Sequence, residues 1–147
     1  MNSRTVEIRE LYKNYTPPQH VLSTVQALLD SVPDEYVSGL DHVVLTNGLI
    51  KMRRPRVLGR YHGKQPGRPP WVELYVNRIA AGTMGHAWIP FLRDLAFGFA
   101  LFHEIEHHAH EDWGTLWENF MDQKYWYLKR VRRPFLRLLR VYTRSLR

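Results

Sequence analysis

The sequence predicts an α+β domain with an N-terminal helix, a mostly antiparallel sheet of about three strands, a long helix, and one or two further helices after it. Two observations support this prediction. Apolar residues recur at helical spacing near both ends of the chain, and runs of β-branched or alternating residues lie between them. The chain has 147 residues and no internal repeat, so we expect one domain over residues 1–147.

The expected N-terminal helix covers residues 20–32, because two prolines precede this stretch and Pro33 follows it. The stretch LDHVVLTN is expected to be a strand that ends at the turn pair Asn47-Gly48. RVLGRYHG is a weaker strand candidate. WVELYVNRI, residues 71–79, is the strongest, because its apolar and more polar residues alternate.

A long buried helix is expected from Pro90 to about His110. Proline suits the first turn of a helix, and the residues that follow are apolar on nearly every side. Gly114 interrupts the helical pattern, which resumes in LWENFMDQKYWYLKR. Pro134 separates this segment from a last helix over residues 134–147, which carries arginines opposite an apolar stripe.

The net charge of +7 is spread unevenly. No acidic residue follows Asp122, and a second group of lysines and arginines lies within residues 51–68. This asymmetry permits an anionic partner, such as nucleic acid or a membrane surface, bound by the basic helix 134–147. An ordinary surface helix, whose arginine stems cover apolar neighbours, explains the same pattern without a partner. No zinc finger, recognition-helix pair or RNA-binding signature is present, so sequence-specific reading of DNA has no support.

Two absences limit the chemistry and the location. The chain has no cysteine, so a bound metal ion must be held by His, Asp or Glu. It also has no apolar stretch long enough to span a membrane, and its N-terminus lacks the apolar block of a signal peptide. A cytoplasmic protein without a transmembrane segment is therefore expected.

The end of the long helix, LFHEIEHHAH, is rich in titratable groups. His103 and His107 are four positions apart, so on a helix they share one face and can bind one tetrahedral Zn²⁺. Glu104 lies beside that face, where it can accept a proton from a zinc-activated water as general base. The alternative is a helix end at which these groups simply face water. Burial of the helix favours the metal site, because buried polar groups need partners.

A catalytic zinc ion usually has three protein ligands and one open position. The candidates for the third ligand are His110, Glu111, Asp112 and Glu118. Three ligands from one straight helix have poor geometry. Glu118 is preferred, because a turn at Gly114 can fold the next helix back over the metal ion.

These motifs, HEIEH followed by WENFMD, resemble the gluzincin arrangement of zinc metallopeptidases, which is thermolysin-like in its ligands. The closest likeness is to compact gluzincins, including the type that cleaves phage and mobile-element repressors. LGRYHG followed by the strand WVELYV is also similar to that type. The resemblance spans about residues 40–130 and implies a minimal zincin-like metallopeptidase domain.

In that family a downstream helix carries Glu-x-x-x-Asp, in which the glutamate binds zinc and the aspartate orients a zinc-binding histidine. The resemblance thus implies Glu118 as third ligand and Asp122 as the residue that fixes an imidazole from behind. The sequence departs from the family pattern in the short spacing of ten residues between His107 and Glu118. Glu106 also fills a position that is usually small or apolar, and Met121 replaces a common small residue.

A peptidase of this kind needs a strand that holds an extended substrate and a donor that stabilises the oxyanion. WVELYVNRI is the expected edge strand, with an interior strand as the alternative. The possible oxyanion donors are His108, His110, Tyr125 and Tyr127.

The first hypothesis is therefore a zinc-dependent metallopeptidase that acts on a protein or peptide. It uses His103, His107 and Glu118 as ligands and Glu104 as base. The second hypothesis is a basic binding module, for nucleic acid or a membrane surface, in which the zinc site is structural or degenerate.

Overall fold

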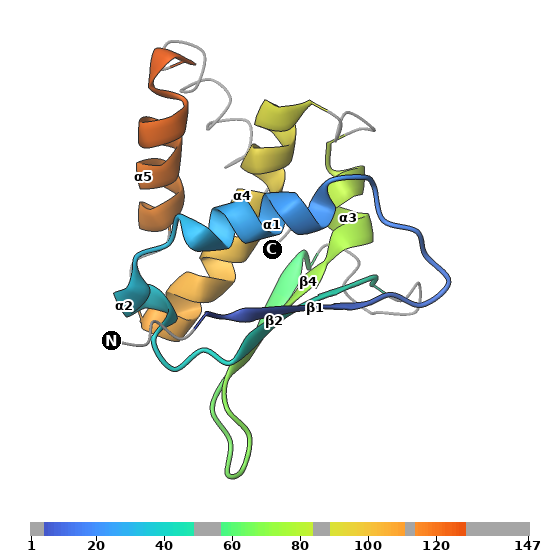
Figure 1. Ribbon diagram of the computed structural model, residues 1–147, viewed down its shortest axis with the longest axis vertical. Coiled ribbons are helices and arrows are strands. Elements are labelled where there is room, and N and C mark those ends of the chain that lie inside the picture. Colours follow the sequence, from blue (N-terminus) through green and yellow to red (C-terminus); the bar gives the residue numbers. More distant parts are fainter. Residues whose placement is uncertain (1–4, 49–56, 84–88, 111–113, 129–147) are drawn as a thin grey trace.

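In the computed structural model, helices cover one side of a four-stranded sheet (Figure 1). The structure describes residues 5–48, 57–83, 89–110 and 114–128. The strands are β1 (Glu7–Leu11), β2 (His42–Thr46), β3 (Gly59–His62) and β4 (Trp71–Tyr75). The helices are α1 (Val21–Asp30), α2 (Asp34–Val37), α3 (Val76–Ala81), α4 (Pro90–Ala109) and α5 (Thr115–Lys124), followed by a 3-10 turn, Trp126–Leu128. The α+β class is confirmed.

The sheet is mixed, with the strand order β1-β2-β4-β3. β1 pairs parallel with β2, β2 pairs parallel with β4, and only β3 is antiparallel to its neighbour β4. The prediction of a mostly antiparallel sheet of about three strands is therefore wrong. It missed β1, which is an exposed edge strand, largely charged, with too little apolar alternation to be recognised.

β2 ends at Thr46, just before the turn pair Asn47-Gly48, where the sequence predicted its end. Both residues of the pair are tied to segments that are distant in the sequence. The Asn47 side chain accepts from the Lys13 N–H and donates to the Lys13 carbonyl (2.8 and 2.9 Å). Gly48 makes the same pair of bonds with the Asn77 side chain (2.8 and 3.2 Å). The end of β2 is thereby joined to the segments that follow β1 and β4, as parallel packing requires.

The strand expected over residues 71–79 ends at Tyr75, where α3 begins. Val76 and Ile79 are both buried, at a spacing that puts them on one helix face. The prediction that this strand lies at an edge is also wrong, because β4 pairs with β2 on one side and β3 on the other. The edge strands of the described sheet are β1 and β3.

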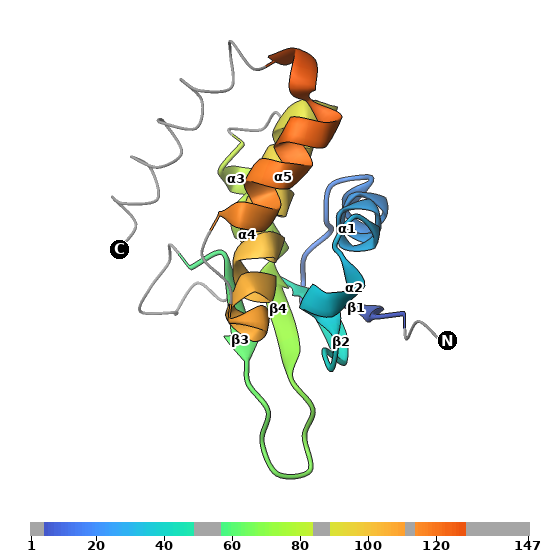
Figure 2. The same cartoon turned by 90° about the vertical axis from the view of Figure 1, so that its left-hand side faces the viewer.

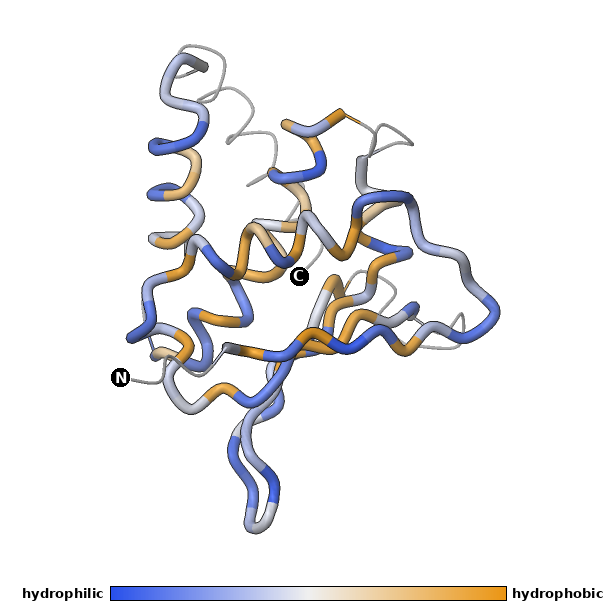
Figure 3. The backbone as a smooth tube through the Cα atoms, viewed as in Figure 1, coloured by the Kyte–Doolittle hydropathy of each residue, from blue (hydrophilic) through white to orange (hydrophobic). Residues whose placement is uncertain are grey.

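The core lies between the sheet and the helices α1 and α4. Val43, Leu45, Val72 and Leu74 point from β2 and β4 to this side and are fully buried. α1 and α4 pack against each other on the same side of the sheet (Figures 1 and 2). Figure 3 shows hydrophobic segments where these layers meet. The long helix is confirmed as a buried element, and α5 runs back beside it.

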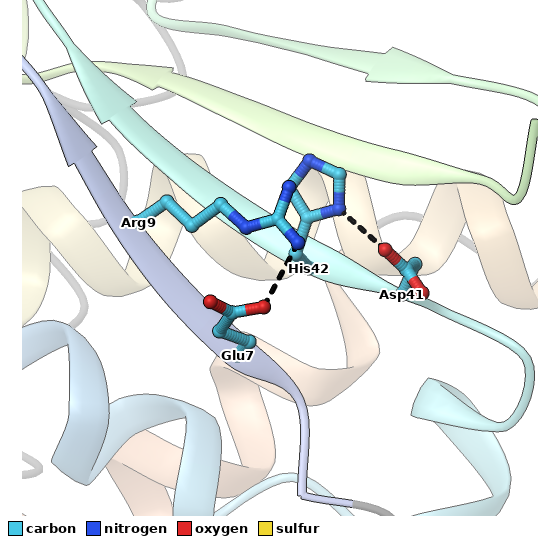
Figure 4. Close-up of polar contacts among 4 residues, drawn as sticks. All are labelled: Glu7, Arg9, Asp41 and His42. Carbon is cyan, nitrogen blue, oxygen red and sulfur yellow. Dashed lines mark hydrogen bonds and ion pairs between the residues drawn. The ribbon is translucent and has the colours of Figure 1, made fainter.

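The opposite side of the sheet is polar and aromatic. Trp71 is stacked between His62 and His42, with ring centroids 3.9 and 5.3 Å away. Glu73 bonds to His62 at 2.9 Å. Figure 4 shows the Asp41–His42 contact at the start of β2 beside the Glu7–Arg9 ion pair of β1. These two histidines therefore have structural partners away from the long helix.

Some predicted features lie outside the described residues. They are the basic helix 134–147, the lysines and arginines of residues 51–56, and the alternative metal ligands Glu111 and Asp112. Within the described residues, no helix has the combination of length and hydropathy that a membrane span requires.

Candidate metal centre and catalytic base

The two motif histidines point toward each other on α4. Their Nε2 atoms are 3.1 Å apart, and their ring centroids are 4.6 Å apart. Two imidazole nitrogens that bind one tetrahedral zinc ion at about 2.0–2.1 Å lie about 3.3 Å from each other. The geometry of His103 and His107 therefore fits two ligands of one metal ion.

Glu104 is buried beside this pair, with 7% of its surface exposed. Burial raises its pKa to about 7, while a hydrogen bond from the Tyr61 backbone N–H and the charge of Arg60 oppose this rise. A carboxylate with a pKa near neutrality has the proton affinity that a general base needs. The predicted base thus lies in an environment that suits its role.

Glu104 lies against the edge strand β3. A side chain added at Gly59 would place its Cβ 3.2 Å from Glu104 Cγ and 2.9 Å from the Glu73 carbonyl oxygen. Glycine is therefore required for strand and helix to approach this closely. The Tyr75 N–H donates to the Leu58 carbonyl, so by antiparallel alternation Gly59 and Tyr61 point their backbone groups away from β4. In the described sheet this outward edge of β3 therefore lies next to Glu104, which accepts from the Tyr61 N–H.

Tyr61 also contacts the helix through its side chain. Its hydroxyl is 2.9 Å from His108 Nδ1, and the two rings meet edge to face. His108 Nε2 is 2.8 Å from the carbonyl oxygen of Ser38. Burial raises the pKa of the Tyr61 hydroxyl, so the phenol keeps its proton at neutral pH.

The hydrogen bonds of Glu106 explain why a carboxylate occupies a position that is usually small or apolar in the gluzincin pattern. It is only 2% exposed, and its carboxylate accepts from the Gly114 N–H (2.7 Å) and the Leu116 N–H (2.9 Å). These N–H groups belong to the start of α5, where backbone donors have no partner within the helix. Glu106 therefore caps α5 and ties its start to α4.

The other ends of these helices are joined as well. Buried Asp94 in the first turns of α4 accepts from Lys124 Nζ (2.6 Å) and from the Tyr125 hydroxyl. α4 and α5 are therefore antiparallel, as the prediction of a returning helix requires. The candidate third ligand, Glu118, is on the returning helix, four positions before Asp122.

Within the part of the chain that the structure describes, no third ligand is brought to the pair. Among the described residues, no group of three His, Asp or Glu side chains is arranged to hold a metal ion. Glu118 and Asp122 are both exposed on α5, and His110 ends α4 in a left-handed conformation with its side chain exposed. The assignment of Glu118 as ligand and Asp122 as its partner residue stays a prediction.

The predicted oxyanion donors differ in how close they lie to the motif on α4. Tyr125 bonds to Asp94, nine residues before His103 on α4, which is about 13 Å along the helix axis. Tyr127 is exposed on the 3-10 turn. His108 contacts Tyr61 and Ser38 and lies beside Glu104. The two tyrosines therefore lie away from the motif.

Comparison of the chain with protein-family models, curated proteins and solved structures gave no match in any of the three. The likeness to compact gluzincins therefore stays a prediction from the short sequence motifs.

Sequence reasoning missed Tyr61 and the capping role of Glu106. Tyr61 lies 47 positions before His108, and no local pattern connects them. Glu106 gave a signal, because a buried helix position occupied by a carboxylate requires a partner. The first N–H groups of the following helix were the available partner.

We expect Glu106→Ala to lower the free energy of unfolding by about 3 kcal/mol, because two N–H groups lose a charged acceptor. Glu106→Gln, which keeps one acceptor oxygen, should lose about half as much. Gln123→Ala, at an exposed position of α5, is the control and should change stability by less than about 0.5 kcal/mol. Urea unfolding of the metal-free proteins measures these differences, and equal losses for Glu106→Ala and Gln123→Ala would contradict the capping role.

Glu104 should make the metal-free protein less stable as pH rises. Its folded pKa of about 7 exceeds the reference value of 4.5, so the unfolded chain loses its proton first. Relative to Glu104→Gln, the wild type should lose on the order of 3 kcal/mol between pH 4.5 and pH 7 and then level off. Urea unfolding at several pH values tests this, and a difference that does not change with pH would show that Glu104 is not buried as described.

Proposed function

We propose that the protein is a zinc-dependent metallopeptidase in which His103 and His107 bind the metal ion and Glu104 is the general base. The observation that carries the proposal is the 3.1 Å approach of the two Nε2 atoms beside a buried carboxylate of raised pKa. Glu118 is the proposed third ligand, and Asp122 is proposed to orient one of the histidines.

The residues of the site divide the chemistry between them. A bound zinc ion supplies a Lewis acid and lowers the pKa of a bound water to about 7. Glu104 accepts a proton from the attacking water and can pass it to the leaving amine, as its near-neutral pKa allows. Burial of Glu104 keeps bulk water away from this proton.

A peptide substrate is favoured over other hydrolase substrates by the edge strand. The outward backbone groups of Gly59 and the outward carbonyl of Tyr61 can pair with an extended chain, since a strand edge recognises main-chain amides, while the Tyr61 N–H donates to Glu104. The sequence predicted this role for the strand at residues 71–79. Because β4 is an interior strand of the described sheet and β3 is an edge strand, we propose the role for β3 instead. A peptide paired there passes beside Glu104, which contacts the same stretch of β3.

Zinc content is the first test. Wild-type protein purified without added metal should contain about one zinc ion per chain by elemental analysis, as expected for a catalytic zinc site. His107→Ala should contain almost none, while Glu118→Ala should retain zinc more weakly, by about ten- to a hundredfold in affinity. His20→Ala, which removes an exposed histidine far from the motif in sequence, is the control. Failure of the wild type to bind zinc even after reconstitution would exclude the metallopeptidase.

Hydrolysis is the second test. Glu104→Gln should lower kcat against a fluorogenic peptide library by at least about a hundredfold while leaving zinc content near one per chain, because only the proton acceptor is lost. Glu73→Gln, a carboxyl group on the polar side of the sheet, is the matched control and should keep activity. A Glu104→Gln variant as active as the wild type would rule out this base. Nucleic acid or vesicle binding unchanged by the substitution, with no hydrolysis in the wild type, would favour the basic binding module.

A further inference from the structure

The structure assigns Tyr61 and His108 as positioning residues: we propose that their contact holds the substrate-pairing edge of β3 at a fixed place on α4, opposite Glu104. The inference rests on the proposed function, because it concerns the same base and the same strand. It adds two residues that neither bind the metal ion nor transfer a proton to substrate.

The spacing of α4 explains how two of its residues reach one tyrosine. Glu104 and His108 are four positions apart and therefore share one helix face, next to the face of His103 and His107. The Tyr61 backbone N–H donates to Glu104, and the Tyr61 hydroxyl bonds to His108 at 2.9 Å. Tyr61 is thus held at two points, one helical turn apart, by its backbone and by its side chain.

The bond of His108 to Ser38 indicates which atom donates in the hydrogen bond between Tyr61 and His108. The Ser38 carbonyl can only accept, so His108 Nε2 carries the proton and donates it. When the ring is neutral, its Nδ1 atom is then an acceptor, and the Tyr61 hydroxyl donates to it. Ser38 follows α2, so this chain of bonds joins β3, α4 and the segment that leads into β2.

Such a contact matters because β3 has few other constraints. It is an edge strand of four residues with β4 as its one partner strand in the described sheet. A shift of about 1 Å between a substrate and its catalytic group can lower a rate by up to about a hundredfold. The side chain of Tyr61, fixed by His108, limits sliding of β3 along α4, and Gly59 permits the close approach.

Three variants separate the bonds of this contact. Tyr61→Phe removes the hydroxyl and keeps the backbone N–H. His108→Asn places an oxygen acceptor near the position of Nδ1 and so preserves the bond from Tyr61. His108→Gln places a donor near the position of Nε2 and preserves only the bond to Ser38. Tyr127→Phe, at an exposed tyrosine, is the control.

We expect Tyr61→Phe and His108→Gln to lower kcat about tenfold with little change in KM, and His108→Asn to retain most of the activity. The double variant Tyr61→Phe/His108→Gln should lose no more than either single variant, since both break the same bond. Zinc content should stay near one per chain throughout, and assays belong well below each variant's melting temperature. Equal kcat values in all variants, or a loss confined to zinc binding or thermal stability, would overturn the inference.

Hydrogen exchange at the amide of residue 61 gives a readout that needs no substrate. It should speed up at least about fivefold in Tyr61→Phe and His108→Gln, remain slow in His108→Asn, and leave β2 unchanged. Unchanged exchange at residue 61 in every variant would overturn the inference. A wild type that binds zinc and shows this exchange pattern but hydrolyses no peptide would instead defeat the proposed function and, with it, the positioning role in catalysis.

Discussion

Burial of α4 is the constraint on which the site depends. The chain has six titratable side chains in the eight positions from His103 to His110, and the same segment buries Ile105 in the core. A buried polar group without a partner costs several kcal/mol, so a segment of this composition is stable only if its neighbours supply partners. For Glu104, Glu106 and His108, the surroundings of α4 meet that requirement with backbone groups and with a side chain from β3.

The partners are separated by helix face. His103 and His107 face each other, while Glu104 and His108 form the adjacent stripe toward β3. Glu106 points to the start of α5. Because successive residues on a helix are about 100° apart, one turn and a half of α4 can contact both a strand and a second helix and still leave a face for the histidine pair. The dense run of histidines and glutamates is therefore spread over several helix faces, two of which have partners in β3 and at the start of α5.

The sequence was sufficient for features that depend on local periodicity. It predicted α1, α4 and β2, and it singled out the histidine pair, whose spacing is itself local. It failed where the outcome depends on distant partners. Asn47 bonds to Lys13 and Gly48 bonds to Asn77, and these hydrogen bonds, which join the ends of parallel strands, leave no local signal in the sequence. Edge strand β1 has a largely exposed, charged sequence, and its pairing is set by the apolar strand beside it.

The glutamate at position 106, where the motif departs from the pattern that the sequence resembles, has a physical explanation. The first N–H groups of any helix have no acceptor within that helix, and Leu116 in the first turn of α5 is buried, so its N–H needs an acceptor from elsewhere. Glu106 supplies the acceptor for the N–H groups of Leu116 and Gly114 from within the motif itself. A small or apolar residue at that position would leave the N–H of buried Leu116 without this acceptor. The glutamate therefore ties the start of α5, the helix that carries Glu118 and Asp122, to the motif on α4.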